Sequence, residues 1–146
     1  MPQDQERFYV AIWAALIRND KLLLMKSNLT GFWELPGGRI EHNELDTVSA
    51  EQSFRREISE EAGLQNFEMG PLVDVMIGYS NAKHNPICRL VYLIKNDFDE
   101  IVLSSEHSEY IWISRDDIDS YQYYTFKNAT TLGDILKKAF EMHDKL

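Results

Sequence analysis

Residues 49–64 read Ser-Ala-Glu-Gln-Ser-Phe-Arg-Arg-Glu-Ile-Ser-Glu-Glu-Ala-Gly-Leu, the stretch with the clearest structural pattern in the chain. It contains neither glycine nor proline before Gly63, which is a typical helix stop. Its apolar residues recur four positions apart, at Ala50, Phe54, Ile58 and Ala62. Because this spacing places side chains on one face of an α-helix, we expect a helix from Ser49 to Ala62, with Thr47 or Ser49 as its N-cap.

Three glutamates, Glu57, Glu60 and Glu61, lie on the side of this helix next to the apolar stripe. Neighbours at such spacings have Cβ atoms about 5–6 Å apart. At an effective dielectric constant of about 20 each like-charge pair costs about 3 kcal/mol, but in water only a few tenths. Two interpretations follow. The glutamates form a solvated surface on which Arg56 pairs with Glu60, or they border a pocket where divalent cations neutralise them.

The type of cation follows from the ligands that the sequence offers. Mg²⁺ prefers oxygen ligands, keeps several waters and bridges to substrate phosphates, so it suits clustered carboxylates. Zinc fits poorly, because no cysteine or histidine pair has ligand spacing and the histidines are scattered, at His42, His84, His107 and His143.

The rest of the chain predicts a sheet between two helical layers. Two almost continuously apolar runs, Phe8 to Ile17 and Lys21 to Met25, flank the turn residues Asn19-Asp20, which indicates a hairpin covered on both faces. Further strands are expected at Val73–Tyr79, Ile87–Ile94 and Tyr110–Ile113. A second helix is expected from Thr131 to His143, with an amphipathic stripe of Leu132, Ile135, Leu136, Ala139 and Phe140.

Length and composition limit the class of protein. The 146 residues fit one domain, 1–146, and 44% hydrophobic residues are enough for a core. With 15 Lys and Arg against 24 Asp and Glu, the net charge of −9 disfavours binding to large nucleic acids. A small phosphorylated ligand stays compatible if bound cations reverse the local sign.

Location is predicted from three features. Cys88 is the single cysteine, so no internal disulfide is expected. Residues 3–6 are Gln-Asp-Gln-Glu where a signal peptide would be basic, and the ten-residue run Phe8 to Ile17 is too short to span a membrane. We therefore expect a cytoplasmic protein with no membrane contact.

A glycine and a glutamate precede the acidic helix at a regular spacing. Gly38 is followed by five residues, Glu44, and then Arg-Glu-Ile-Ser-Glu-Glu-Ala-Gly-Leu at residues 56–64. This arrangement resembles the signature of the Nudix hydrolases: glycine, five residues, glutamate, seven residues, then Arg-Glu-apolar-any-Glu-Glu-any-Gly-apolar. Trp-Glu-Leu-Pro-Gly-Gly at residues 33–38 resembles the entry to that signature, so the direct match covers residues 33–64.

The spacer departs from the family pattern. Eleven residues separate Glu44 from Arg56 where the family has seven, so four are added around Leu45 to Ser49. Four residues are close to one helical turn, which keeps the three glutamates on the same side of the helix. The added residues could extend the helix at its start or enlarge the loop before it, and both alternatives leave open whether Glu44 still supports the loop against the helix.

The resemblance implies roles for individual residues. Glu57, Glu60 and Glu61 would ligate one to three Mg²⁺ or Mn²⁺ ions, together with the backbone carbonyl of Gly37, and Arg56 would orient a glutamate. The family uses a glutamate as general base, and Glu106 is the best candidate outside the signature, with Glu109 and His107 as alternatives. The other interpretation of residues 104–109 is a polar loop without chemistry.

Substrate contacts are encoded weakly. Arg89 is a candidate phosphate contact, although a strand arginine is more often a surface charge. Glu34 and Asn128 are further candidate substrate residues, and Lys127 lies beside Asn128 before the last helix. The aromatic candidates for stacking on a base, which also suit a core, are Phe32, Tyr79 and Tyr124.

The resemblance implies an α/β (α+β) fold, a Nudix-type α/β/α sandwich with a central mixed sheet. It also implies a magnesium-dependent pyrophosphohydrolase that cleaves a diphosphate bond in a small nucleotide or nucleoside diphosphate derivative by attack of water on phosphorus. Three alternatives stay open: a Nudix-like nucleotide sensor without catalysis, an acidic helix for protein contacts, and the family's isoprenyl diphosphate isomerase branch, which uses a cysteine. A homodimer is compatible with the sequence.

Overall fold

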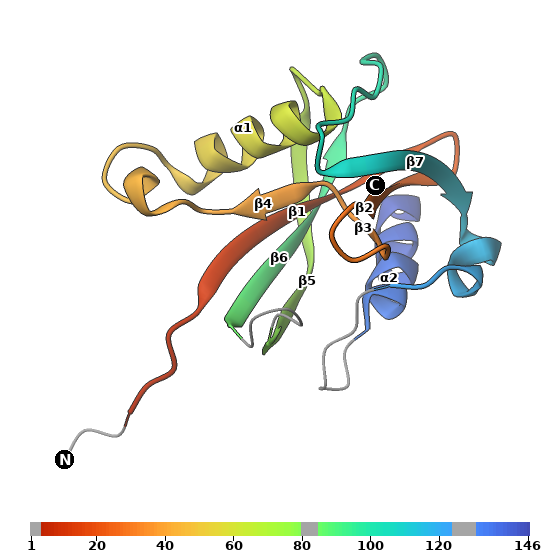
Figure 1. Cartoon of the computed structure of the whole chain (residues 1–146). Coiled ribbons are helices and arrows are strands. Elements are labelled where there is room, and N and C mark those ends of the chain that lie inside the picture. Colours follow the sequence, from red (N-terminus) through yellow and green to blue (C-terminus); the bar gives the residue numbers. More distant parts are fainter. Residues whose placement is uncertain (1–3, 80–84, 124–130) are drawn as a thin grey trace.

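The structure, a computed structural model, describes residues 4–79, 85–123 and 131–146. Figure 1 shows a twisted sheet with one helix on each side. The elements are β1 (Tyr9–Arg18), β2 (Lys21–Ser27), β3 (Trp33–Glu34), β4 (Gly37–Arg39), the 3₁₀ helix η1 (His42–Glu44), α1 (Ala50–Ala62), β5 (Glu68–Tyr79), β6 (Pro86–Lys95), β7 (His107–Ser114), the 3₁₀ helix η2 (Arg115–Ser120) and α2 (Leu132–Asp144). The expected α/β/α sandwich is confirmed.

The long strand β1 organises the sheet. Its last residues form the expected hairpin with β2, and Asn19 and Asp20 take the positive φ angles, 50° and 60°, that a two-residue hairpin turn requires. The preceding part of β1 pairs in parallel with β6 and antiparallel with β4, so the sheet is mixed. The strand order is β3-β2-β1-β6-β5, with β7 paired to β2.

Two cores lie on opposite faces of the sheet. Because side chains alternate along a strand, β1 contributes to both. One core packs against α2 and contains Ala11, Trp13, Ala15, Ile17, Leu136 and Phe140. The other packs against α1 and contains Ile12, Ala14, Leu16, Phe54 and Ile58. This burial on both faces explains the continuous apolar runs in the sequence.

Both helices agree with the predicted ranges to within one residue at each end. Ser49 caps α1: its hydroxyl accepts from the Gln52 backbone N–H at 3.1 Å, and the Gln52 side chain accepts from the Ser49 N–H at 2.9 Å. Gly63 ends the helix in the left-handed conformation, with φ of 77°. The N-cap of α2 is Thr131, whose hydroxyl accepts from the Asp134 N–H.

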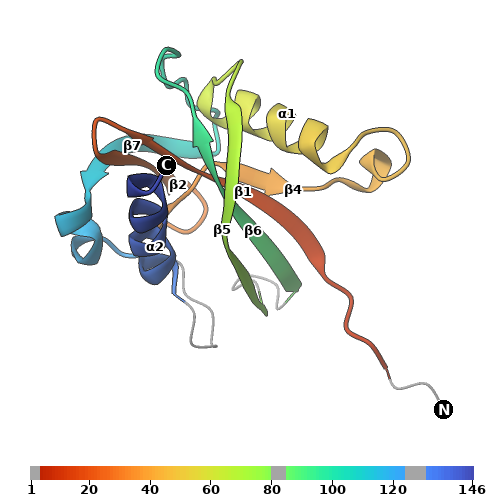
Figure 2. The same cartoon turned by 180° about the vertical axis from the view of Figure 1, so that it is seen from behind.

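The strands differ from the prediction mainly in length. β5 begins at Glu68 rather than Val73, and β7 begins at His107 rather than Tyr110. The short strands β3 and β4 are absent from the prediction, because two or three residues are too few to show alternation. Figure 2 shows β5 and β6 from behind, with α1 and α2 on opposite sides of the sheet. No helix in the described ranges is long and apolar enough to cross a membrane.

Candidate active site

An open pocket lies where α1 and β4 meet strands β1 and β6, and its lining includes Ala11, Trp13 and Ile87 from the core on the α2 side. Within the described part of the chain, five carboxylates and two guanidinium groups line it: Glu34, Glu41, Glu57, Glu61, Glu106, Arg39 and Arg89. The chain therefore gathers carboxylates from α1, β3 and two loops around one space. Such a concentration of like charge requires either protonation or a cation.

The Glu57 side chain packs against Gly38, the second glycine of β4. Its side chain is 13% exposed, and a Cβ atom built on Gly38 would collide with its carboxylate. At Gly37 a Cβ would overlap the backbone of Ile12 and the ring of Trp13. Only glycine fits this close approach of β4 to α1 and β1. Burial raises the pKa of Glu57, although Arg56 opposes the shift.

Glu61, one turn further along α1, is the most strongly perturbed acid of the pocket. Its side chain is 10% exposed. Burial raises its pKa to about 9, with further contributions from Glu106, by hydrogen bond and charge, and from the charges of Glu57 and Glu34. The structure therefore brings Glu106, predicted from a distant loop, next to the acidic helix.

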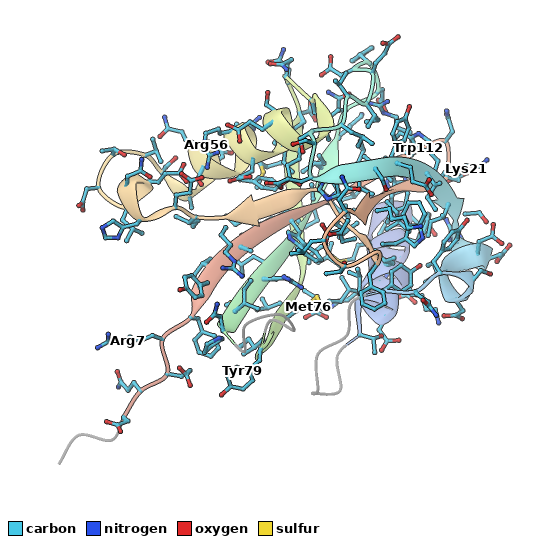
Figure 3. The ribbon with its side chains drawn as sticks, viewed as in Figure 1. Arg7, Lys21, Arg56, Met76, Tyr79 and Trp112 are labelled. Atoms are coloured by element: carbon cyan, nitrogen blue, oxygen red, sulfur yellow. The ribbon has the colours of Figure 1, made fainter. Side chains whose placement is uncertain are left out.

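Arg56 connects the loop before α1 to the glutamates on it, and Figure 3 labels it on the helix above β4. Its Nη2 donates to Glu44 at 2.8 Å and to Glu57 at 2.9 Å, and its Nη1 donates to Glu60 at 3.0 Å. Glu44 also accepts from the Ser53 hydroxyl at 3.0 Å, and Arg56 holds the pKa of Glu44 below its usual value. Glu44 therefore still supports the loop.

Glu60 is placed differently from the other two glutamates. Its side chain is 58% exposed, it pairs with Arg56, and it is absent from the described lining of the pocket. Both sequence interpretations thus hold in part: Glu60 belongs to a solvated surface, whereas Glu57 and Glu61 border a pocket.

His107 and Glu34 form a contact behind the glutamates. The Nε2 atom of His107 lies 2.8 Å from Oε1 of Glu34, and its Nδ1 atom lies 3.7 Å from Oε2 of Glu61. The chain around His107 is tied to the loop after β2, because the Asn28 N–H donates to the Glu106 carbonyl and the Asn28 side chain donates to the Ser105 carbonyl.

The sequence that builds this site is matched by a family model. A model described as NUDIX domain matches residues 8–134. The chain belongs to the Nudix hydrolase family. The family and the enzyme class that residues 33–64 predict are therefore confirmed.

Relatives of this Nudix chain include two curated proteins named 8-oxo-dGTP diphosphatase. The one from Proteus vulgaris is 32% identical over 65 residues, covering 42% of this chain and about half of that protein, 54%. The one from Buchnera aphidicola subsp. Schizaphis graminum is 27% identical over 131 residues, covering 86% of this chain and 91% of that protein. In fold, the chain resembles the MutT protein from Methanosarcina mazei Go1, with a TM-score of 0.75 at 19% identity, over 99% of this chain and all of that one.

The longer Nudix spacer is accommodated outside the pocket. Leu45 to Val48 lie on the surface between η1 and α1, and the Thr47 and Val48 N–H groups donate to the Glu44 carbonyl. The added residues thus form a surface loop before α1, and they leave the contacts of Glu44 with Arg56 in place.

Arg89, from β6, is among the residues that line the pocket. Its guanidinium carbon lies 4.2 Å from the centre of the Trp13 ring. Arg39 and Glu41 also line the pocket, and the sequence analysis missed both. The signal available in the sequence was their closeness to Gly38, one and three residues before them.

Several other predicted residues lie elsewhere. Figure 3 shows Tyr79 at the end of β5 that is remote from α1. Phe32 lines a separate hollow with Tyr121 and Tyr123. Glu109 is exposed, and Cys88 is not among the residues that line the pocket, although its neighbours Ile87 and Arg89 are. Outside the described residues are His84, Tyr124, Lys127 and Asn128.

The donor set of the pocket suits a hard cation. Its described lining offers carboxylate and backbone oxygens but no cysteine or histidine, which favours Mg²⁺ or Mn²⁺ over zinc. As the side chains of the described ranges stand, no three acidic, histidine or cysteine groups already converge on one point. The raised pKa values of Glu57 and Glu61 fit a site that a cation would neutralise.

Proposed function

We propose that the chain, acting as a single domain of residues 1–146, is a Mg²⁺- or Mn²⁺-dependent pyrophosphohydrolase. Its substrate is a small nucleotide or a nucleoside diphosphate derivative. The observation that carries the proposal is the burial of Glu57 and Glu61 beside Glu106, which raises the pKa of Glu61 to about 9. Acidic side chains in a pocket whose pKa values are this strongly raised indicate a functional site.

In this proposal Glu57, Glu60 and Glu61 hold the cations together with the carbonyl of Gly37. Glu60 would have to turn from its surface pair with Arg56, to which it is joined at 3.0 Å. A bound divalent cation supplies charge neutralisation and polarises the phosphoryl oxygens.

The chain's own residues then position the reactants. Arg56 fixes Glu57 and Glu44, and Glu106 accepts the proton of the attacking water. The oxygen of this water bonds to phosphorus while the bond between phosphorus and the bridging oxygen breaks. The bridging oxygen leaves with the other phosphate. Glu34, Arg89 and Asn128 are proposed substrate residues, with Arg89 contacting a phosphate.

The names of the two curated relatives favour a nucleoside triphosphate with an oxidised base as the first substrate to test. We also propose a cytoplasmic location, in keeping with the single cysteine, and leave a homodimer as a state to be measured by light scattering.

A substrate panel tests the proposal. Oxidised and ordinary nucleoside triphosphates and dinucleotide diphosphates are incubated with Mg²⁺ or Mn²⁺, and products are identified by mass spectrometry in ¹⁸O-water. We expect one substrate class to yield a nucleotide or phosphate product that carries one ¹⁸O. Tight binding of a nucleotide without any product would instead support the sensor alternative.

Matched variants locate the chemistry. Glu57→Gln and Glu61→Gln are expected to lower kcat at least about 100-fold. Glu51→Gln is the control, because Glu51 lies on the same helix, is exposed and pairs with Arg55. Activity near that of the wild type in Glu61→Gln would reject the proposed site.

A further inference from the structure

The buried imidazole of His107 bridges two acids of the pocket. Its side chain is 2% exposed, and its two ring nitrogens face different carboxylates: Nε2 faces Glu34 at 2.8 Å, and Nδ1 faces Glu61 at 3.7 Å. His107 itself does not line the pocket. It is therefore placed to act on the glutamates from behind rather than on a substrate.

The backbone leaves this ring little freedom. His107 opens β7 opposite Ser27, where the β2–β7 register shifts. Its N–H donates to the Ser104 carbonyl, and the Asn28 N–H donates to the Glu106 carbonyl. The second of these bonds also holds the backbone of Glu106, so the imidazole and the proposed base lie on one hydrogen-bonded segment.

The Nδ1 atom is a buried polar atom that has no hydrogen-bond partner among the described residues. Leaving such an atom unpaired is unfavourable, and the carboxyl group of Glu61 lies 3.7 Å from it. A small rotation of Glu61 toward β7 would bring it within hydrogen-bond distance of Nδ1. The Nε2 contact with Glu34 meanwhile keeps the ring in the orientation that presents Nδ1.

We propose that His107 is a positioning residue, which aims the Glu61 carboxylate through Nδ1 while Glu34 anchors the ring through Nε2. This inference rests on the proposed function, in which Glu61 holds a cation. Groups that orient metal-binding residues commonly change metal affinity or activity about 10–100-fold when they are removed.

Three substitutions separate the two ring nitrogens. In His107→Asn the amide approximates Nδ1, in His107→Gln it approximates Nε2, and His107→Leu removes both polar atoms at similar volume. We expect Leu to weaken Mn²⁺ binding, measured by electron paramagnetic resonance without substrate, about 10–100-fold. Asn should restore most of the affinity, whereas Gln should not. For turnover, kcat should follow the same order while KM changes less.

A double-mutant comparison shows whether the effect passes through Glu61. In a Glu61→Gln background, His107→Leu should have little further effect on Mn²⁺ affinity. Equal losses in the Asn, Gln and Leu variants, in step with their thermal midpoints, would overturn the inference in favour of a structural role. Wild-type affinity and kcat in His107→Leu would overturn it as well.

Crystal structures of the wild type and His107→Leu without metal distinguish failure of the inference from failure of the proposed function. We expect the Glu61 carboxylate to leave its position beside β7 in the variant. If it does so but the wild type binds no Mn²⁺, the positioning role stands and the proposed hydrolase fails. If Glu61 keeps its position while the wild type binds Mn²⁺, the hydrolase stands and the positioning role fails.

Discussion

At the scale of single residues, Glu61 shows how burial changes an ordinary side chain. A glutamate on an exposed helix would stay ionised at neutral pH, but burial together with Glu106, Glu57 and Glu34 raises the pKa of Glu61 to about 9. Proton uptake by this group is therefore coupled to folding. The metal-free protein should carry Glu61 protonated near neutral pH.

This shift predicts a pH dependence of stability. The folded-state pKa lies above the unfolded value of 4.5, so the contribution of Glu61 is fully present below 4.5 and is lost as pH rises toward about 9. Without metal, the thermal midpoint of the wild type should fall over this range by at least a few degrees more than that of Glu61→Gln. Thermal unfolding followed by circular dichroism in EDTA measures the difference. Parallel curves for the two proteins would contradict the prediction.

Gly38 gives a second prediction at this scale. In Gly38→Ala the new Cβ would collide with the Glu57 carboxylate, so we expect kcat to fall about tenfold or more as Glu57 is displaced. Gly133→Ala is the matched control, because its Cβ would meet only ordinary contacts at 3.8 Å or more, and alanine favours the helix. Steady-state kinetics with Mg²⁺ compares the two variants. Equal activity in both would show that the clash is relieved without moving Glu57.

At the scale of elements, the cap of α1 and its packing against the sheet contribute to different properties. The Ser49–Gln52 capping box satisfies the first N–H groups of the helix, whereas Phe54 and Ile58 anchor it to the sheet. The cap sets how stable the helix is, and the packing sets where Glu57 and Glu61 lie. Leu45 to Val48 of the longer spacer lie on the surface before this cap.

Ser49→Ala should therefore cost stability but not activity. Loss of an N-cap hydroxyl costs about 1 kcal/mol, which shifts the thermal midpoint of a domain of this size by about 2–4 °C. We expect kcat at 25 °C to stay within twofold of the wild type, because the apolar face of α1 still holds the helix in place. Ser59→Ala, in the last turn of the same helix and remote from the N-cap, is the control. A large loss of kcat in Ser49→Ala would mean that the cap also positions the glutamates.

At the scale of the whole molecule, one sheet separates two cores with different tasks. The α1 core supports Glu57 and Glu61. The α2 core supplies Ala11, Trp13 and Ile87 to the described lining of the pocket, whereas none of its residues on α2 itself lines it. Figures 1 and 2 show the two helices on opposite sides of β1 and β6. Damage to the two cores should thus have similar effects on stability but different effects on function.

Ile58→Ala and Phe140→Ala test this separation. Both side chains are at most 1% exposed, and each truncation should cost about 2–5 kcal/mol in the free energy of unfolding. Well below their thermal midpoints, Phe140→Ala should keep most of the wild-type kcat, whereas Ile58→Ala should lose it because α1 shifts toward the cavity. Urea unfolding and kinetics at low temperature provide the comparison. The opposite ranking of kcat would contradict the division of tasks.

The sequence by itself determined the local features. The period of four in residues 50–62 specifies α1, Gly63 specifies its end, and Asn19-Asp20 specifies the hairpin turn, because each depends on neighbours within a few positions. The motif of residues 33–64 likewise determined the family. Strands β3 and β4 escaped detection, since their pairing depends on β1 and β2 rather than on a pattern of their own.

Only the tertiary structure decided which candidate residues line the pocket and which face solvent. Glu57, Glu60 and Glu61 are equivalent in the sequence, but burial under β4 and beside Glu106 perturbs Glu57 and Glu61, while Glu60 turns to solvent. The contacts of His107 with Glu34 and Glu61 join residues up to 73 positions apart. Burial and charge coupling between distant segments arise from packing, and no local pattern encodes them.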